Sequence, residues 1–179
     1  MLHLNELGNK SLVKLLLYFI KNPSKEASQA DIRKSLKIAK ATLIKNLNKL
    51  EDCGGILVKR HYQFKTYKID NNNIMIKQLK RIHTLNSLDG IIRYFIKHDL
   101  NAFLYGSSAR GEDFEDSDID IIIIGRARLE NIIADIRRFS ESIGKDIKIK
   151  VFSHLQLAGL SRNDRPFYER FEKDKIKLN

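Results

Sequence analysis

The sequence is poor in cysteine, proline and glycine, with 1, 2 and 9 of them among 179 residues. The one cysteine, Cys53, cannot form a disulfide bond within the chain, so we expect a reducing compartment. The histidines are scattered, whereas a structural zinc site needs several Cys or His at short spacing. The longest apolar runs, 15–20 and 119–124, fall far short of the ~20 residues that cross a membrane. We expect a soluble cytoplasmic protein without a signal peptide or a membrane partner.

Charge is distributed unevenly along the chain. The formal net charge is +11, and apolar residues make up 42% of the sequence, which is typical of a globular protein. Residues 1–70 hold 14 basic and 6 acidic side chains, a net of +8, whereas residues 71–179 hold 19 and 16, a net of +3. A basic surplus of this size favours a polyanionic partner for the N-terminal part.

The first 70 residues predict three helices followed by a β-hairpin. Apolar positions recur at helical spacing, Ser28 with Asp31 three residues later predicts a helix cap, and Gly54-Gly55 ends the third helix. The expected elements are helices over 10–21, 28–36 and 40–52 and strands over 56–60 and 64–69.

This order of elements resembles the winged helix-turn-helix domain, and the matching stretch is 28–70. The resemblance implies that the third helix enters the major groove of double-stranded DNA beside the wing, and that the protein forms a homodimer. We assign residues 1–70 to this domain, although docking of a protein is an alternative use of the fold. The residues expected to contact DNA are Thr42, Lys45, Asn46, Lys49, Lys59, Arg60, Lys65 and Lys68.

A helical stretch over 74–98 follows the joint Asn71-Asn72-Asn73. We place a break in it at Gly90, which divides a connecting helix from the first helix of a second domain. That second domain is expected to span residues 74–179.

Residues 102–125 contain the pattern that indicates chemistry. A short apolar strand ends in Gly106-Ser107, and Asp118 and Asp120 begin a second apolar strand after a ten-residue interval. Side chains two positions apart on a strand project from the same face, so the two carboxylates form a pair that suits Mg²⁺ (or Mn²⁺). Gly106 lets a ligand approach the backbone, and Ser107 offers a hydroxyl and an N–H to a phosphate. The pattern predicts a nucleoside triphosphate site.

The pattern resembles the DNA polymerase β-type nucleotidyltransferase superfamily in its minimal form. Arg110-Gly111 and Asp116-Ser117 also match the family's surroundings of the motif. The resemblance covers about residues 75–179 and implies an α/β (α+β) fold with a mixed sheet flanked by helices. It also implies that metals on Asp118 and Asp120 bridge the triphosphate while a hydroxyl attacks the α-phosphorus. Arg110 either contacts the phosphates or pairs with a nearby acid.

A later strand departs from the family pattern. Active members carry a third carboxylate there, and counting from Gly144 that position is Lys148 in this chain. Asp146 lies one pleat earlier on the same face. Either Asp146 supplies the third metal ligand or that ligand is missing. A lysine here opposes a second metal by its charge, and it could instead meet a phosphate or an anionic partner.

Two functions from different classes follow. The first is metal-dependent transfer of a nucleoside monophosphate from an NTP, with ATP expected, to a hydroxyl acceptor. Antitoxin-type minimal members imply a HEPN-type protein partner as the acceptor. The second is a DNA-binding transcriptional regulator whose transferase domain is degenerate and only binds a nucleotide or a partner. Polymerisation on nucleic acid is disfavoured because the chain is short.

Overall fold

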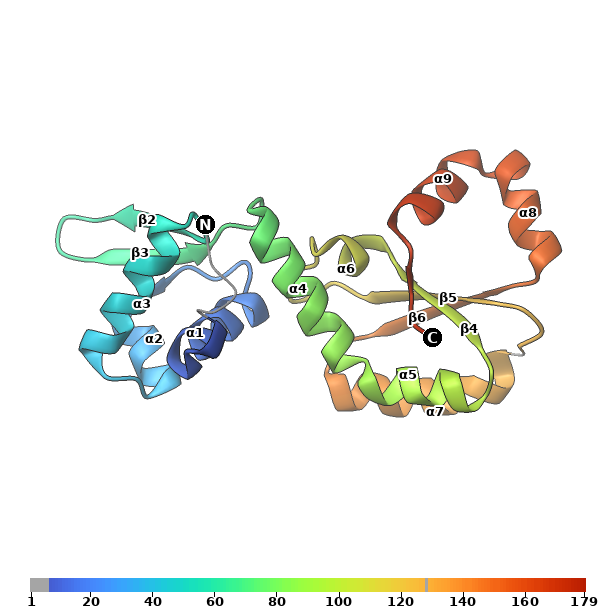
Figure 1. Cartoon of the computed structure of the whole chain (residues 1–179), viewed down its shortest axis with the longest axis horizontal. Helices are drawn as coiled ribbons and strands as arrows, with labels where there is room; N and C mark the ends of the chain where they lie inside the picture. Colours follow the sequence, from blue (N-terminus) through green and yellow to red (C-terminus); the bar gives the residue numbers. More distant parts are fainter. Residues whose placement is uncertain (1–6, 128) are drawn as a thin grey trace. The chain divides into compact units, whose positions relative to one another are not determined.

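The computed structural model describes residues 7–127 and 129–179 (Figure 1). The chain divides into two compact units between Leu79 and Lys80. Helix α4 (Ile74–Ser87) contains this division, and each unit has its own hydrophobic core. No helix in the described part of the chain is long and apolar enough to cross a bilayer.

The N-terminal unit is built from three helices and a three-stranded antiparallel sheet of order β1-β3-β2. The three expected helices and the hairpin are present, and Ser28 and Asp31 form the expected capping box. The two-residue strand that pairs with β3 was not expected from the sequence. The elements are α1 (Lys10–Lys21), β1 (Ala27–Ser28), α2 (Gln29–Leu36), α3 (Lys40–Asp52), β2 (Ile56–Arg60) and β3 (Lys65–Ile69).

One residue predicted to contact DNA lies instead in the core of this unit. Asn46 is 1% exposed, and its side-chain amide donates a hydrogen bond to the Ser11 hydroxyl at 3.0 Å. It follows the buried Leu43 by three positions, which turns it toward α1 together with Leu47. The prediction that Asn46 contacts DNA is therefore wrong.

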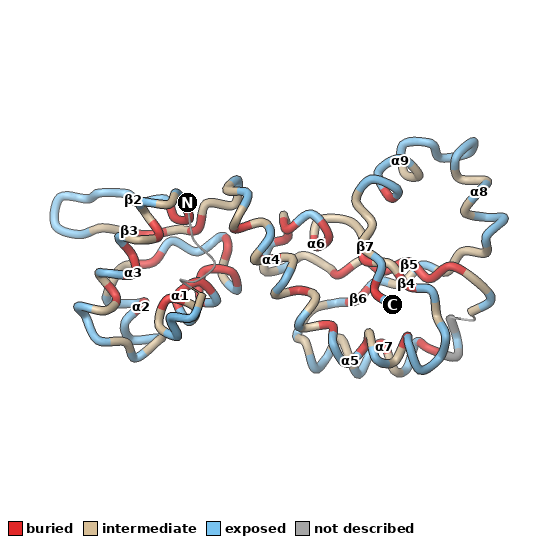
Figure 2. The backbone as a smooth tube through the Cα atoms, viewed as in Figure 1, coloured by how far each residue is buried: buried red, intermediate tan, exposed pale blue. Residues whose placement is uncertain are grey.

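The C-terminal unit contains a four-stranded mixed sheet of order β6-β5-β4-β7. Strand β5 pairs antiparallel with β4 and parallel with β6, which confirms the predicted mixed α/β fold. The six residues of β5 are buried except one, Asp120, so this strand is the centre of the unit (Figure 2). The strands are β4 (Asn101–Tyr105), β5 (Ile119–Ile124), β6 (Ile147–Phe152) and β7 (Ile176–Lys177).

Helices cover the two faces of this sheet differently. One face packs on α5 and α7 through alternate isoleucines of β5, including Ile121 and Ile123. The opposite face packs on α9 through Ile122, Ile124 and Phe171. Since Asp120 shares the second face by strand alternation, α9 and Asp120 lie on the same side of the sheet. The helices are α5 (Asp89–Lys97), α6 (Gly106–Arg110), α7 (Leu129–Ile143), α8 (His154–Asn163) and α9 (Arg165–Asp174).

The break in the helical stretch falls at Leu88, between α4 and α5, and not at the predicted Gly90. Gly90 lies inside α5, where a Cβ atom would be 3.2 Å from Cε1 of Phe139 on α7. The absence of a side chain at Gly90 therefore allows α5 to pack closely on α7. The chain turns at Leu88, the residue before α5.

Candidate functional site

Gly106 begins α6 directly after β4, and its geometry ties this turn to Asp120. The residue has a φ of +75°, and a Cβ atom there would lie 2.7 Å from Oδ2 of Asp120. Both the left-handed backbone and the close contact require glycine. The group that approaches this backbone in the structure is the Asp120 carboxylate, whereas the sequence predicted a ligand there.

The start of β5 is held beside α6. Tyr105, the last residue of β4, pairs in register with Asp120. The hydroxyl of the buried Ser108 donates to the main-chain carbonyl of Asp118 at 3.4 Å, a long hydrogen bond. The start of α6, with Ser107, is thereby held close to the start of β5, with Asp118 and Asp120.

The electrostatics of the pair distinguish the two carboxylates. Burial, and then the charge of Asp118, raises the pKa of Asp120 above its ordinary value. Burial, and then the charge of Asp120, raises the pKa of the neighbouring Tyr105 to about 12, so this phenol stays protonated at neutral pH. Asp120 is therefore a carboxylate that is costly to ionise, and the nearby charges of Lys148 and Lys150 offset part of that cost.

Lys148 lies beside both carboxylates. It is the register partner of Asp120 on the adjacent parallel strand β6, and its ammonium forms an ion pair with Oδ2 of Asp118. The hydrogen bond from the ammonium to Asp118 raises the pKa of Lys148, so the lysine is charged at neutral pH. The position where the family pattern places an acid therefore holds a cation in contact with the acid pair.

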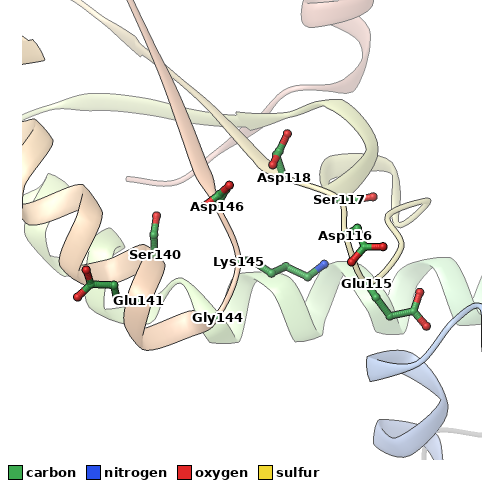
Figure 3. Close-up of a pocket in the computed structure, with 9 residues that line it drawn as sticks. All are labelled: Glu115, Asp116, Ser117, Asp118, Ser140, Glu141, Gly144, Lys145 and Asp146. Carbon is green, nitrogen blue, oxygen red and sulfur yellow. The ribbon is translucent and has the colours of Figure 1, made fainter.

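Asp146 lies at the start of β6, next to an acidic pocket of about 470 Å³ (Figure 3). Figure 3 shows Asp118 and Asp146 projecting to the same side of the sheet, with Glu115 and Asp116 on the loop before β5. Yet residues 7–127 and 129–179 contain no group of three Asp, Glu, His or Cys arranged to hold a metal ion. Asp146 therefore does not complete a three-ligand site with Asp118 and Asp120.

Comparison with known families identifies the C-terminal part of the chain. A nucleotidyltransferase domain matches residues 88–177, a stretch that contains Gly106, both aspartates and Lys148. The chain belongs to the nucleotidyltransferase domain family. No curated protein matches it. Among solved structures, the iron-bound ferric uptake regulator from Francisella tularensis is similar at 16% sequence identity. The alignment spans 81% of this chain and 86% of the regulator, with a TM-score of 0.35. That score is too low to support an argument about function.

Arg110 of the nucleotidyltransferase domain is engaged in ion pairs. Its Nε lies 2.8 Å from Oε2 of Glu112, and an Nη lies 2.8 Å from Oδ2 of Asp174 on α9. The hydrogen bond to Glu112, and then the one to Asp174, raises the pKa of the guanidinium. The sequence left two roles open for Arg110, a contact with the phosphates or an ion pair with a nearby acid, and the structure shows the ion pair. The second partner, Asp174, was not indicated by the sequence.

A second pocket, of about 520 Å³, joins the motif to α9. Gly106, Ser107 and Asp120 line one side of it, and Arg170 and Lys173 of α9 line the other. This volume is within the usual range for small-molecule sites. Sequence reasoning missed these two basic residues, because nothing in the local sequence shows that α9 lies over this face of the sheet.

Aromatic packing fixes α9 in that place. Pro166 lies in the first turn of α9, and the Phe167 ring lies 6.0 Å from that of Tyr105. Phe171 is 1% exposed and contacts the same tyrosine at 6.1 Å. Both phenylalanines therefore pack on the sheet, and they hold the basic face of α9 at the pocket.

A buried lysine anchors the loop between the two halves of the motif. Lys80 is 2% exposed, and its ammonium donates a hydrogen bond to the main-chain carbonyl of Asp113. Asp113 also forms an ion pair with Lys145 at 3.0 Å. Burial lowers the pKa of Lys80, which the charge of Asp113 opposes. This anchor was not predicted, because Lys80 is distant in sequence and has no motif of its own.

The remaining residues predicted to contact DNA lie on α3 and the hairpin of the N-terminal unit. Lys45 is exposed on α3. Lys59 pairs with Glu26 at 2.6 Å and Arg60 pairs with Glu51 at 3.3 Å, and both basic side chains are 68% exposed. Pairs this exposed are weak and can be exchanged for phosphate contacts. Thr42, Lys49, Lys65 and Lys68 are half-buried on the same elements.

Proposed function

We propose that the C-terminal domain transfers a nucleoside monophosphate from an NTP to a hydroxyl acceptor. Membership of the nucleotidyltransferase family supports the class of reaction. The observation that supports it most directly is the pocket between Ser107 and α9, because Asp120 lines it beside two basic side chains. A triphosphate needs hydroxyl or N–H donors and positive charge on one side and a metal-binding carboxylate on the other.

Each residue has a role in this proposal. Ser107 binds a phosphate through its hydroxyl and N–H, and Arg170 and Lys173 neutralise the triphosphate. Asp118, directly before β5, and Asp120, within it, both lie beside Lys148, and their carboxylate oxygens fit a divalent cation, Mg²⁺ or Mn²⁺. Such a cation, when bound, stabilises charge on the attacking and leaving oxygens. Tyr105 remains a neutral hydrogen-bond donor beside Asp120.

The finer assignments rest on the resemblance of the motif. Antitoxin-type minimal members of the superfamily favour ATP as the nucleotide and a HEPN-type protein as the acceptor. Such a partner supplies the hydroxyl group, and the chain's own residues supply the positioning.

For the N-terminal unit we propose a winged helix that binds double-stranded DNA, as a homodimer. Its order of helices and hairpin, its net charge of +8 over residues 1–70 and the exposed Lys45 support this. A DNA-binding regulator with a degenerate transferase domain is the second candidate function. Lys148 is the observation that favours it, because the lysine neutralises part of the acid pair.

One labelling experiment separates the two functions. The protein is incubated with α-³²P-labelled ATP and Mg²⁺, with and without cell lysate, beside Asp118→Asn and Asp120→Asn. We expect label transfer that both substitutions abolish. Asp116→Asn is the matched control, because this exposed acid precedes the motif and we give it no role in the chemistry. Absence of transfer by the wild type, with DNA binding unchanged in all variants, would instead establish the regulator.

A further inference from the structure

The backbone places Lys148 on the same face of the sheet as the acid pair. Asp120 and Lys148 are directly paired on adjacent parallel strands, and paired residues project from the same face of a sheet. The ammonium reaches Oδ2 of Asp118, one pleat away. A cation covalently attached to β6 therefore pairs with one of the two carboxylates that would hold metal ions and lies on the strand position next to the other.

The rest of this strand does not restore the missing acid. Asp146 does not form a three-ligand group with the pair among the residues described. Lys150, one pleat further along the same face, adds a second positive charge, and its ammonium lies 5.0 Å from the Phe167 ring centroid. The β6 side of the site therefore presents two cations and one acid, whereas a two-metal site needs acids there.

We propose that the Lys148 ammonium takes the place of one of two divalent cations, so that the site binds its nucleotide with a single divalent cation. This inference rests on the proposed nucleotidyl transfer function. Asp118 is shared between the lysine and the incoming cation, and Asp120 faces the pocket. The ammonium supplies a fixed positive charge beside the triphosphate, and it repels a second divalent ion from the same carboxylates.

The test counts bound metal ions and does not depend on catalysis. The full chain is mixed with equimolar α,β-methylene-ATP, an analogue that cannot undergo the transfer, and titrated with Mn²⁺. Free Mn²⁺ is measured by electron paramagnetic resonance, and analogue binding by equilibrium dialysis. The variants are Lys148→Asp, which restores an acid, and Lys148→Ala, which removes the charge. Lys150→Ala is the matched control, because it removes the same side chain one pleat away.

We expect one Mn²⁺ per chain for the wild type, Lys148→Ala and Lys150→Ala, and two for Lys148→Asp. Since the Lys148 side chain is 63% exposed, these variants should fold, and circular dichroism verifies this. As a second readout, Mn²⁺ should raise the melting temperature of Lys148→Asp more than that of the wild type, because the ion relieves repulsion among the added and existing acids.

Different outcomes overturn different statements. Two Mn²⁺ ions on the wild type, or no gain in Lys148→Asp, would overturn the inference while nucleotide binding still supported the proposed function. Absence of analogue binding by every variant would overturn the proposed function, and the inference would fall with it.

Discussion

At the residue scale, the site depends on the contact between Gly106 and Asp120. The glycine has no Cβ, so the carboxylate packs against the backbone at the start of α6. The same packing buries the carboxylate and raises its pKa. One contact therefore explains both the glycine at position 106 and the raised pKa of Asp120, which favours binding of a cation by this carboxylate.

Gly106→Ala should abolish this arrangement. The new methyl group meets Oδ2 of Asp120 in a backbone of positive φ, so we expect a loss of about 1–2 kcal/mol in the free energy of unfolding. Nucleotide binding should fall by at least about tenfold, which corresponds to ~1.4 kcal/mol. Chemical denaturation and equilibrium dialysis measure the two effects. Gly159→Ala is the control, since its Cβ meets only the Asn163 side chain, at 3.9 Å in a helix, and should be neutral or stabilising.

Asp120→Asn should stabilise the metal-free protein at neutral pH. Below the ordinary value of 3.8 the wild-type carboxyl is protonated in both the folded and the unfolded chain. As pH rises above 3.8 the unfolded chain releases its proton first, so wild-type stability falls until the raised folded pKa is passed. Asn never ionises, and we expect an advantage of up to about 1 kcal/mol at pH 7, allowing for solvent screening.

Urea unfolding in chelator, between pH 4 and pH 8, measures this difference. The advantage of Asp120→Asn should shrink toward the acid end, whereas Asp116→Asn, an exposed control, should stay within about 0.5 kcal/mol of the wild type. An advantage that grew as pH fell would contradict the assigned pKa direction.

At the scale of the elements, α4 and α9 position parts of the site that the motif does not contain. Lys80 of α4 holds the loop before Asp118 through the Asp113 carbonyl. Asp174 of α9 holds Arg110 at the end of α6. Contacts from two helices, α4 and α9, therefore hold the loop between Ser107 and Asp118, and this keeps the two halves of the motif close together.

Lys80→Met should loosen this loop. Removing the ammonium leaves the main-chain carbonyl of Asp113 without its donor, so we expect about 1–3 kcal/mol less stability and weaker nucleotide binding. Hydrogen exchange should accelerate over residues 112–117. Lys97→Met, an exposed substitution on α5, serves as the control, and equal effects of the two would show that Lys80 acts only through general charge.

At the scale of the whole molecule, the basic surplus and the acid pair belong to different units. The net of +8 over residues 1–70 lies in the unit with α3 and the hairpin. The acids of the motif bring the second part near to neutrality. DNA binding and nucleotide chemistry should therefore respond to different substitutions.

Lys45→Ala should weaken DNA binding without affecting nucleotide binding. A lost phosphate contact lowers the slope of log affinity against log salt by about one. Fluorescence anisotropy on duplex DNA between 50 and 200 mM salt measures this. Lys97→Ala removes an equal charge from the second unit, and it should leave the slope unchanged. An equal loss in both variants would show that the total charge, and not α3, attracts the DNA.

The sequence by itself determined the helices and the hairpin of the first 70 residues and the composition of the motif. The family resemblance of the motif implied the mixed sheet and placed the third-acid position at Lys148. Strand alternation predicted that Asp118 and Asp120 share a face, and local pattern predicted the capping box at Ser28. Short-range periodicity is sufficient for such features, because it depends on residues within a few positions of each other.

Tertiary packing alone decided the remaining features. It turned Asn46 into the core, placed Gly90 against Phe139 and brought Lys80 to the Asp113 carbonyl. It also laid α9 over the Asp120 face of the sheet. Each of these contacts joins residues far apart in sequence, and their positions depend on how helices pack on sheets and on each other. No local pattern records that packing, because many arrangements bury the same apolar faces equally well.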